Sequence, residues 1–280
     1  MMNDKTTMNR LRDAVYGLAI GDALGVPYEF KKRGSFECTG MAGGFGAHEQ
    51  PKGTWSDDTS MTIATQRSIR DNDGRIDTDD IHNNFILWAA DEEFTAGGEV
   101  FDIGIATGEA LRTGNPCTGE YDNGNGSLMR ILPLAFTDCT DEEIRAVSAI
   151  THGHEISMQA CVIYVHVARR LLAGETIQEI IPDLIYDKPF DRLSRIDQLT
   201  EDEIRSGGFV VDTLEASLWC LANNRDFRET VLAAVNLGKD TDTTGAVCGG
   251  LAGIVYGLDS DFAKECMEQL RGREVIEGCL

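Results

Sequence analysis

Positive charge and long apolar runs are both scarce in this sequence. Its 280 residues include 25 lysines and arginines against 47 aspartates and glutamates, which gives a formal net charge of −22. Nucleic acids and anionic membranes are bound by basic surfaces, so neither is an expected partner. No apolar run reaches the roughly eighteen residues of a membrane span, and residues 1–10 lack the apolar core of a signal peptide. We therefore expect a cytoplasmic protein, and we expect it to be a monomer.

The cysteines lack the spacing of a metal site or of a disulfide framework. There are eight, no two of them form a CxxC pair, and the chain is far longer than the small secreted domains that depend on disulfides. Free thiols in a reducing compartment are the better interpretation.

Signals for β-strands are nearly absent, since apolar and polar residues never alternate for more than about four positions. Helical periodicity dominates, no low-complexity linker divides the chain, and the weakest pattern lies in residues 186–209. We predict one all-α domain over residues 1–280, with roughly ten to twelve helices. The predicted helices cover residues 9–26, 57–70, 78 onward, 144–150, 156–172, 176–185, 211–222, 227–237, 243–256 and 260–271.

Three glycines in the first predicted helix are spaced by four residues, at Gly17, Gly21 and Gly25. Glycine lowers the stability of a helix, but a row of glycines on one face lets another backbone approach closely. We therefore expect a close packing partner on this face.

Two acidic turns lie far apart in the sequence, at residues 56–59 and 240–243. Each places two aspartates and hydroxyl side chains within four residues, ahead of an apolar helical stretch. Such residues are good helix caps, so capping alone explains either turn taken singly. If the fold brings the turns together, a hard divalent cation would offset the repulsion between their carboxylates. Oxygen ligands of this kind suit Mg²⁺ or Mn²⁺ rather than Zn²⁺.

A turn rich in asparagine and glycine, residues 123–127, precedes another apolar stretch. Its backbone amides could cradle an anion at the N-terminus of the predicted helix. A simple helix-capping loop is the alternative.

Seven motifs in this order resemble the ADP-ribosylglycohydrolase family, whose members remove ADP-ribose from dinitrogenase reductase and from modified arginine or serine side chains. The resemblance covers nearly the whole chain and implies an orthogonal multi-helix bundle. The motifs are GLAIGDALGVPYE (17–29), GTWSDDTSM (53–61), FDIG (101–104), NGNGSLMR (123–130), THGHE (151–155), VVDTLEASLW (210–219) and GKDTDTTGAVCGGLAGIVYG (238–257).

The resemblance implies a binuclear metal site that holds two Mg²⁺ or Mn²⁺ ions between the acidic turns. Glu29 matches a residue that reaches this site and moves with substrate. Many relatives have threonine where this chain has Ser56, and serine lacks the methyl group that would restrict its rotamer. The implied ligands are Ser56, Asp57, Asp58, Asp240, Asp242 and Thr243.

The resemblance also implies residues that contact the substrate. Asn125, Gly126 and Ser127 would contact the pyrophosphate. His152 would contact the ligand, although a lone histidine is more often structural. Phe209 stands where some relatives have a tyrosine near the ribose or adenine, and it keeps the stacking surface without the hydroxyl.

Asp102 would assist proton transfer, although it could instead cap a helix at residues 101–104. Together with Glu29, Asp58 and Asp242 it completes the catalytic set that the resemblance implies.

The implied reaction is hydrolysis at the anomeric carbon of ribose, which releases ADP-ribose from a modified side chain, with arginine as the first expectation. The partner would be an ADP-ribosylated protein or a small ADP-ribose conjugate. Serine-linked ADP-ribose, O-acetyl-ADP-ribose and modified bases stay open as substrates. So do a role as antidote to an ADP-ribosylating toxin and a non-catalytic role, either binding ADP-ribose or serving as a crystallin-like protein.

Overall fold

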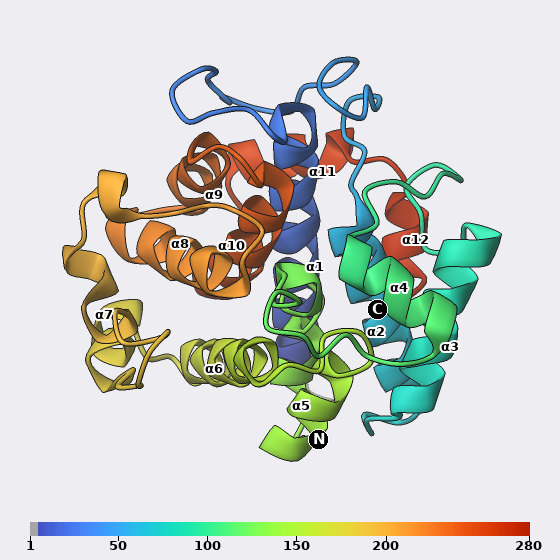
Figure 1. Ribbon diagram of the computed structural model, residues 1–280. Coiled ribbons are helices and arrows are strands. Elements are labelled where there is room, and N and C mark those ends of the chain that lie inside the picture. The colour runs from blue at the N-terminus through green and yellow to red at the C-terminus, as the bar shows by residue number, and fades with distance from the viewer. Residues whose placement is uncertain (1–4) are drawn as a thin grey trace.

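Helices make up the regular structure of residues 5–280, the range that the computed structural model describes (Figure 1). Within this range there is no β-strand, and two isolated bridges join residue 117 to 152 and residue 124 to 209. The predicted all-α fold is confirmed. The α-helices are α1 (Lys5–Gly25), α2 (Asp57–Asp71), α3 (Thr78–Asp91), α4 (Ile105–Thr113), α5 (Asp141–Ser148), α6 (Glu155–Leu172), α7 (Ile177–Ile180), α8 (Val210–Asn223), α9 (Phe227–Asn236), α10 (Thr241–Tyr256), α11 (Asp261–Gln269) and α12 (Arg273–Glu277).

The glycine row of α1 packs against a second glycine-containing helix, α10. A methyl group added at Gly21 would lie 2.0 Å from the carbonyl oxygen of Gly245, and one at Gly25 would lie 2.3 Å from Cα of Asp242. Only glycine allows two helix backbones to approach this closely. The packing therefore fixes the start of α10, where the second acidic turn lies, against the end of α1.

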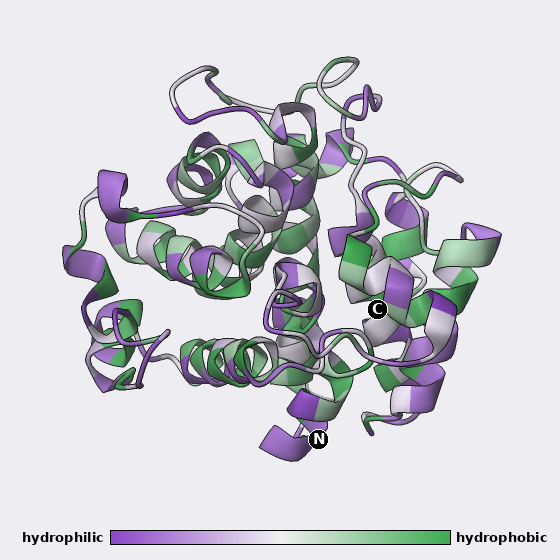
Figure 2. Cartoon of the chain, in the orientation of Figure 1, coloured by the Kyte–Doolittle hydropathy of each residue, from purple (hydrophilic) through white to green (hydrophobic). Residues whose placement is uncertain are grey.

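The other helices surround this central pair. In Figure 1, α8 and α9 lie on the same side of α1 as α10, whereas α2, α3 and α4 lie on the opposite side. Figure 2 shows hydrophobic residues along α6 and hydrophilic residues on α5 and on most outer loops. The largest fully buried side chains include Trp55, Trp88, Tyr16 and Tyr164. The core thus extends on both sides of α1 and supports both acidic turns.

Two helix predictions are wrong in part. The helix predicted over residues 176–185 ends as an α-helix at Ile180 and continues as the 3-10 helix Ile181–Asp183, because Pro182 has no N–H to donate. No α-helix follows the turn at residues 123–127. That stretch forms the 3-10 helices Asn125–Ser127 and Leu132–Phe136, the second of which contains Pro133. An anion there would not meet the dipole of a long helix.

All eight cysteines are free thiols, as the sequence predicts. None of the helices within residues 5–280 combines the length and the apolar character needed to cross a membrane.

Candidate active site

The fold brings the two acidic turns together. The hydroxyl of Thr243 lies 3.4 Å from Oδ2 of Asp58, although 185 residues separate the two in the sequence. Glu29, Asp240 and Asp242 each place one carboxylate oxygen within 4.8 Å of the others. This cluster lies where α1, α2 and α10 meet, and these helices also position its residues.

Contacts from α1 hold both turns, through a backbone carbonyl for one and a carboxylate for the other. The hydroxyl of Thr241, in the second turn, donates to the carbonyl oxygen of Gly25 at 2.8 Å. In the first turn, the backbone amides of Ser56 and Thr59 donate to the Asp22 carboxylate. Ser56 is also the N-cap of α2, since its hydroxyl accepts from the amide of Asp58 at 3.3 Å.

The carboxylates of this cluster are buried, and burial determines their electrostatics. The pKa values of Asp57, Asp58 and Asp242 are raised well above the usual range for aspartate, first by loss of solvent and then by neighbouring carboxylates. Oδ1 of Asp58 and Oδ2 of Asp242 are buried and accept no hydrogen bond from any described residue. Buried polar atoms normally have hydrogen-bond partners or metal ions, so these two oxygens are candidates for binding a ligand.

The chemistry of these donors fits a hard cation. Carboxylate and hydroxyl oxygens from two turns converge, no thiol joins them, and two of the oxygens lack partners. Mg²⁺ and Mn²⁺ prefer such oxygen ligands, and a cation would offset the repulsion between the carboxylates. The acidic cluster is therefore able to hold a metal ion.

A second cluster joins Glu29 to His48 and Asp102. Nε2 of His48 contacts Oε2 of Glu29 and lies 3.6 Å from Oδ1 of Asp102. Burial, followed by the nearby charge of Glu29, raises the pKa of Asp102 to about 7. The contact with Glu29 raises the pKa of His48. Nothing in the sequence singled out His48, because it is an isolated histidine in a glycine-rich loop.

Strained backbone accompanies the acids. Phe30, Asp102 and Lys239 all have positive φ angles, of 65°, 62° and 65°. Residues other than glycine adopt this region uncommonly, and strained positions tend to cluster at functional sites. Asp102 does not cap a helix, because α4 begins at Ile105 after an N-cap at Gly104. The capping alternative for Asp102 is therefore wrong.

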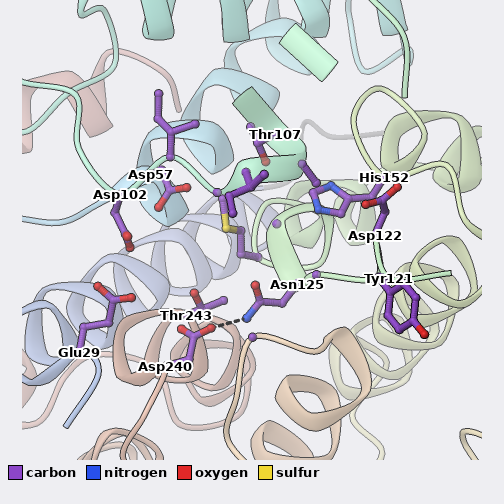
Figure 3. A pocket seen from close by; sticks show the side chains of 18 of the residues that line it. Glu29, Asp57, Asp102, Thr107, Tyr121, Asp122, Asn125, His152, Asp240 and Thr243 are labelled. Atoms are coloured by element: carbon purple, nitrogen blue, oxygen red, sulfur yellow. Dashed lines mark hydrogen bonds between the residues drawn. The ribbon is translucent and has the colours of Figure 1, made fainter. Parts of the chain in front are cut away.

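A cavity of about 590 Å³ separates two walls that differ in charge (Figure 3). Figure 3 shows Glu29, Asp57 and Asp102 on one side and His152 and Tyr121 on the other. We call Glu29, Asp57, Asp102 and Asp240 the acidic wall, and Thr107, Asn125, Gly126 and His152 the neutral wall. One further aspartate, Asp122, lines the cavity beside His152.

Asn125 connects the two walls. Its side-chain amide donates to Oδ2 of Asp240 and to the hydroxyl of Thr213, both at 2.9 Å. Its backbone amide donates to the carbonyl oxygen of Gly208 at 3.0 Å, so that amide is already used. Asn125 therefore fixes the distance between the neutral wall and the second acidic turn.

His152 is buried against the glycines of the neutral wall. A methyl group added at Gly126 would lie 2.8 Å from Cε1 of His152 and 3.0 Å from the hydroxyl of Thr107. Burial and the positive charge of Arg130 lower the pKa of His152 to about 3, so its ring is neutral near pH 7. Arg130 is fully buried behind this wall and donates to the carbonyl oxygen of Gly126 at 2.9 Å.

Five of the predicted site residues do not line the cavity: Ser56, Asp58, Ser127, Phe209 and Asp242. Ser127 is fully buried, and its hydroxyl accepts a hydrogen bond from Ser148 at 2.9 Å. Phe209 is the N-cap of α8 and is 38% exposed. Ser56 and Asp242 lie beneath the surface of the acidic wall. The other predicted site residues line the cavity: Glu29, Asp57, Asp102, Asn125, Gly126, His152, Asp240 and Thr243.

Comparison with known proteins places the chain in a family. The profile described as ADP-ribosylglycohydrolase matches residues 3–280. ADP-ribosylarginine hydrolase Tri1 of Pseudomonas putida (strain GB-1) is 32% identical over 292 residues, which cover 99% of this chain and 78% of that protein. ADP-ribosyl-[dinitrogen reductase] glycohydrolase of Rhodospirillum rubrum is 30% identical over 92% of this chain and 89% of its own length.

A solved structure agrees with these sequence matches. A chain of the structure titled "ADP-ribosylglycohydrolase-related protein complex" superposes with a TM-score of 0.82 at 32% identity, covering 99% of this chain and 97% of that one. Fold, motifs and sequence identity therefore agree, and the chain belongs to the ADP-ribosylglycohydrolase family.

Proposed function

We propose that this protein is a metal-dependent hydrolase that removes ADP-ribose from modified arginine side chains. The observation that carries the proposal is the meeting of the two acidic turns beside the cavity, with carboxylate oxygens that lack partners. The similarity to an ADP-ribosylarginine hydrolase over 99% of the chain supports arginine as the acceptor. A guanidinium group is a cation and would be complementary to the acidic wall.

Two Mg²⁺ or Mn²⁺ ions would be held by Ser56, Asp57 and Asp58 from the first turn and by Asp240, Asp242 and Thr243 from the second. When bound, such ions would supply Lewis acidity for the ribose hydroxyls and for the attacking water. The oxygen-only donor set and the unpartnered oxygens of Asp58 and Asp242 support this assignment.

The substrate would lie across the cavity between the walls. Asn125, Gly126 and His152 would contact the pyrophosphate, and Phe209 would lie near the adenosine. Ser127 is fully buried and hydrogen-bonded to Ser148, so it would support this turn from behind. The neutral wall would suit an anion through its uncharged polar groups and through Arg130 behind it, although a carboxylate, that of Asp122, lies beside His152. Glu29 would orient the ribose, because its carboxylate faces the cavity near Asp240.

The reaction would replace one bond at the anomeric carbon. The water oxygen bonds to that carbon while the bond from the carbon to the guanidine nitrogen breaks. Asp102 would accept a proton from the attacking water and return a proton to the leaving nitrogen, so that the carboxylate is regenerated and no net proton is gained or lost. The transition state develops positive charge on the ribose, which the buried carboxylates of the acidic wall would stabilise.

Several broader expectations belong to the same proposal. We expect a monomeric, single-domain enzyme of the cytoplasm, where eight free thiols stay reduced. Its partner would be an ADP-ribosylated protein or a small ADP-ribose conjugate, while the net charge of −22 disfavours a nucleic-acid substrate.

A turnover assay tests the proposal directly. Protein stripped with chelator is given Mg²⁺ or Mn²⁺ and ADP-ribosylarginine, and the release of free ADP-ribose and arginine is followed by mass spectrometry. Serine-linked ADP-ribose and O-acetyl-ADP-ribose are run in parallel. Turnover of arginine conjugates that stops with chelator is the expected result. Faster turnover of another conjugate would overturn the assignment of arginine, and binding without turnover would overturn the enzymatic function.

A further inference from the structure

Asp22 is a buried carboxylate behind the first acidic turn. It lies on α1, is fully buried, and does not line the cavity. No lysine, arginine or histidine within residues 5–280 forms an ion pair with it. A buried charge is costly unless hydrogen bonds compensate for lost solvent, so its partners indicate what it does.

All the hydrogen bonds to Asp22 come from the start of α2. The amide of Ser56 donates to Oδ1 at 2.9 Å and to Oδ2 at 3.0 Å. Oδ2 also accepts from the amide of Thr59 at 3.0 Å and from its hydroxyl at 2.6 Å. Asp22 therefore caps the first turn of α2 from a different helix.

Several helices of this protein are capped from within their own sequence, and α2 has such a cap too, since the Ser56 hydroxyl accepts from the amide of Asp58. Asp77 caps α3 by accepting from the amides of Asp79 and Asp80, and Asp226 caps α9 by accepting from the amide of Glu229. An aspartate at the start of a helix normally satisfies free amides in this way. In α2, Asp22 takes two of these amides, and Oδ1 of Asp58 is left without a partner.

The same turn of α1 also holds the second acidic turn. Gly25, three residues after Asp22, accepts from the hydroxyl of Thr241 and lies against the backbone of Asp242. One turn of α1 thus contacts both acidic turns. The carboxylate of Asp22 contacts the first, and the backbone of Gly25 contacts the second. A shift of the first turn relative to α1 would change the spacing between the two sets of acids.

We propose that Asp22 is a positioning residue for the metal site: it caps α2 from α1, so that the carboxylates of Asp57 and Asp58 stay free to bind cations. This inference rests on the proposed function, since it assumes that the acidic turns hold metal. It concerns how the ligands are held rather than which residues are ligands. A residue of this kind behind the ligands typically changes metal affinity by about 10–100-fold when it is replaced.

The experiment compares two buried contacts with a remote cap. Asp22→Asn keeps the size of the side chain but replaces one carboxylate oxygen with an NH₂ group. That group cannot accept hydrogen bonds from the amides of Ser56 and Thr59. Thr59→Val keeps the carboxylate and removes only the hydroxyl that donates to it. Asp77→Asn is the matched control, since it alters the cap of α3, whose residues do not line the cavity.

Binding of Mn²⁺ to chelator-stripped protein is measured by electron paramagnetic resonance, beside the thermal midpoint and turnover at increasing Mn²⁺. We expect Asp22→Asn to weaken Mn²⁺ binding at least about tenfold, and excess Mn²⁺ to restore part of its turnover. Thr59→Val should weaken binding a few-fold. Asp77→Asn should leave both the thermal midpoint and the Mn²⁺ affinity close to those of wild type, because asparagine also caps a helix.

The outcomes separate this inference from the proposed function. If wild-type protein binds Mn²⁺ and both variants bind it within about twofold of wild type, Asp22 only stabilises the fold and the inference is overturned. If Asp22→Asn does not fold, Thr59→Val decides the question by the same measurement. A wild-type protein that binds no Mn²⁺ would overturn the metal site itself, and the inference with it.

Discussion

The acidic wall and the neutral wall of the cavity differ in how their buried polar groups are satisfied. On the neutral wall, the side-chain amide of Asn125 has two acceptors, and His152 contacts the hydroxyl of Thr151 at 2.8 Å. Behind the acidic wall, Asp58 and Asp242 each keep one oxygen without a partner. Behind the neutral wall the unpartnered atom is a donor, Nε of Arg130, whereas behind the acidic wall the unpartnered atoms are carboxylate oxygens, which a cation would satisfy.

The charges behind the walls also differ. Arg130 lies behind the neutral wall, and its charge helps to keep His152 neutral. Asp22 lies behind the acidic wall and adds a carboxylate to it. If the proposed function is right, cations would bind beside the acids and the pyrophosphate would bind on the side of Arg130.

The largest effect is expected from Asp242→Asn on the acidic side. The change keeps the size of the side chain and removes one charge, so α10 should still begin at Thr241. Turnover should fall roughly a thousandfold, because the water and ribose are no longer positioned. Hydrolysis rates and circular dichroism check this, with Asp261→Asn at the start of α11 as the control. Turnover near that of wild type would show that the second turn holds no essential metal.

Asp102→Asn should have the next largest effect, with a different signature. Asp102 lines the cavity and is proposed to accept a proton, so its amide variant should slow turnover about a hundredfold. Mn²⁺ affinity should stay within about twofold of wild type, because Asp102 is not among the proposed ligands. Rates and Mn²⁺ binding are measured on the same preparation. A parallel loss of metal binding would contradict the separation of the two roles.

Gly126→Ala tests the neutral wall. The added methyl group would lie 2.8 Å from Cε1 of His152 and must displace its ring or the hydroxyl of Thr107. We expect affinity for ADP-ribose, measured by calorimetry, to fall about tenfold through overpacking of the site. Mn²⁺ affinity should not change. Gly40→Ala is the control, since no atom lies within 4 Å of the methyl group it adds. Equal losses in both variants would indicate a general effect of alanine.

The sequence predicted the acidic wall better than the neutral one. Each acidic turn places its ligand candidates side by side, as at Asp57 and Asp58, so a short motif was enough to find them. The neutral wall draws on separate segments. A helix beginning at its turn would be interrupted at Pro133, which has no N–H to donate, and 3-10 helices form there instead. Sequence periodicity does not resolve such short turns.

His48 and Asp22 show what sequence reasoning missed. Each is a single residue whose partners are distant: His48 meets Asp102, and Asp22 meets Ser56 and Thr59. Asp22 lies within the motif at residues 17–29, where the neighbouring glycines indicate helix packing. Its partners Ser56 and Thr59 are 34 and 37 residues away, so no local pattern predicts their contact.

Metal removal should lower stability through the acidic wall alone. Carboxylates that repel one another raise the free energy of the folded state, and a bound cation stabilises it by mass action. At a metal concentration about a hundred times the dissociation constant, the gain is about 2.7 kcal/mol, or roughly 5 °C in the thermal midpoint. Melts with chelator, Mg²⁺ and Mn²⁺ check this, with Asp242→Asn as the control that should respond less. Identical midpoints for wild type under all conditions would contradict a bound metal ion.

The smallest effect is expected from the pH dependence of the neutral wall. The pKa of His152 is about 3 in the folded protein, against about 6.5 when unfolded, so only the unfolded chain gains this proton as pH falls below 6.5. Wild-type stability should therefore lose about 1 kcal/mol between pH 7.5 and 5.5 that His152→Gln does not lose. Urea unfolding of both proteins at the two pH values isolates this difference, because other groups that titrate are common to both. If both lose the same stability, His152 is charged in the folded protein, and the wall is not neutral below pH 6.5.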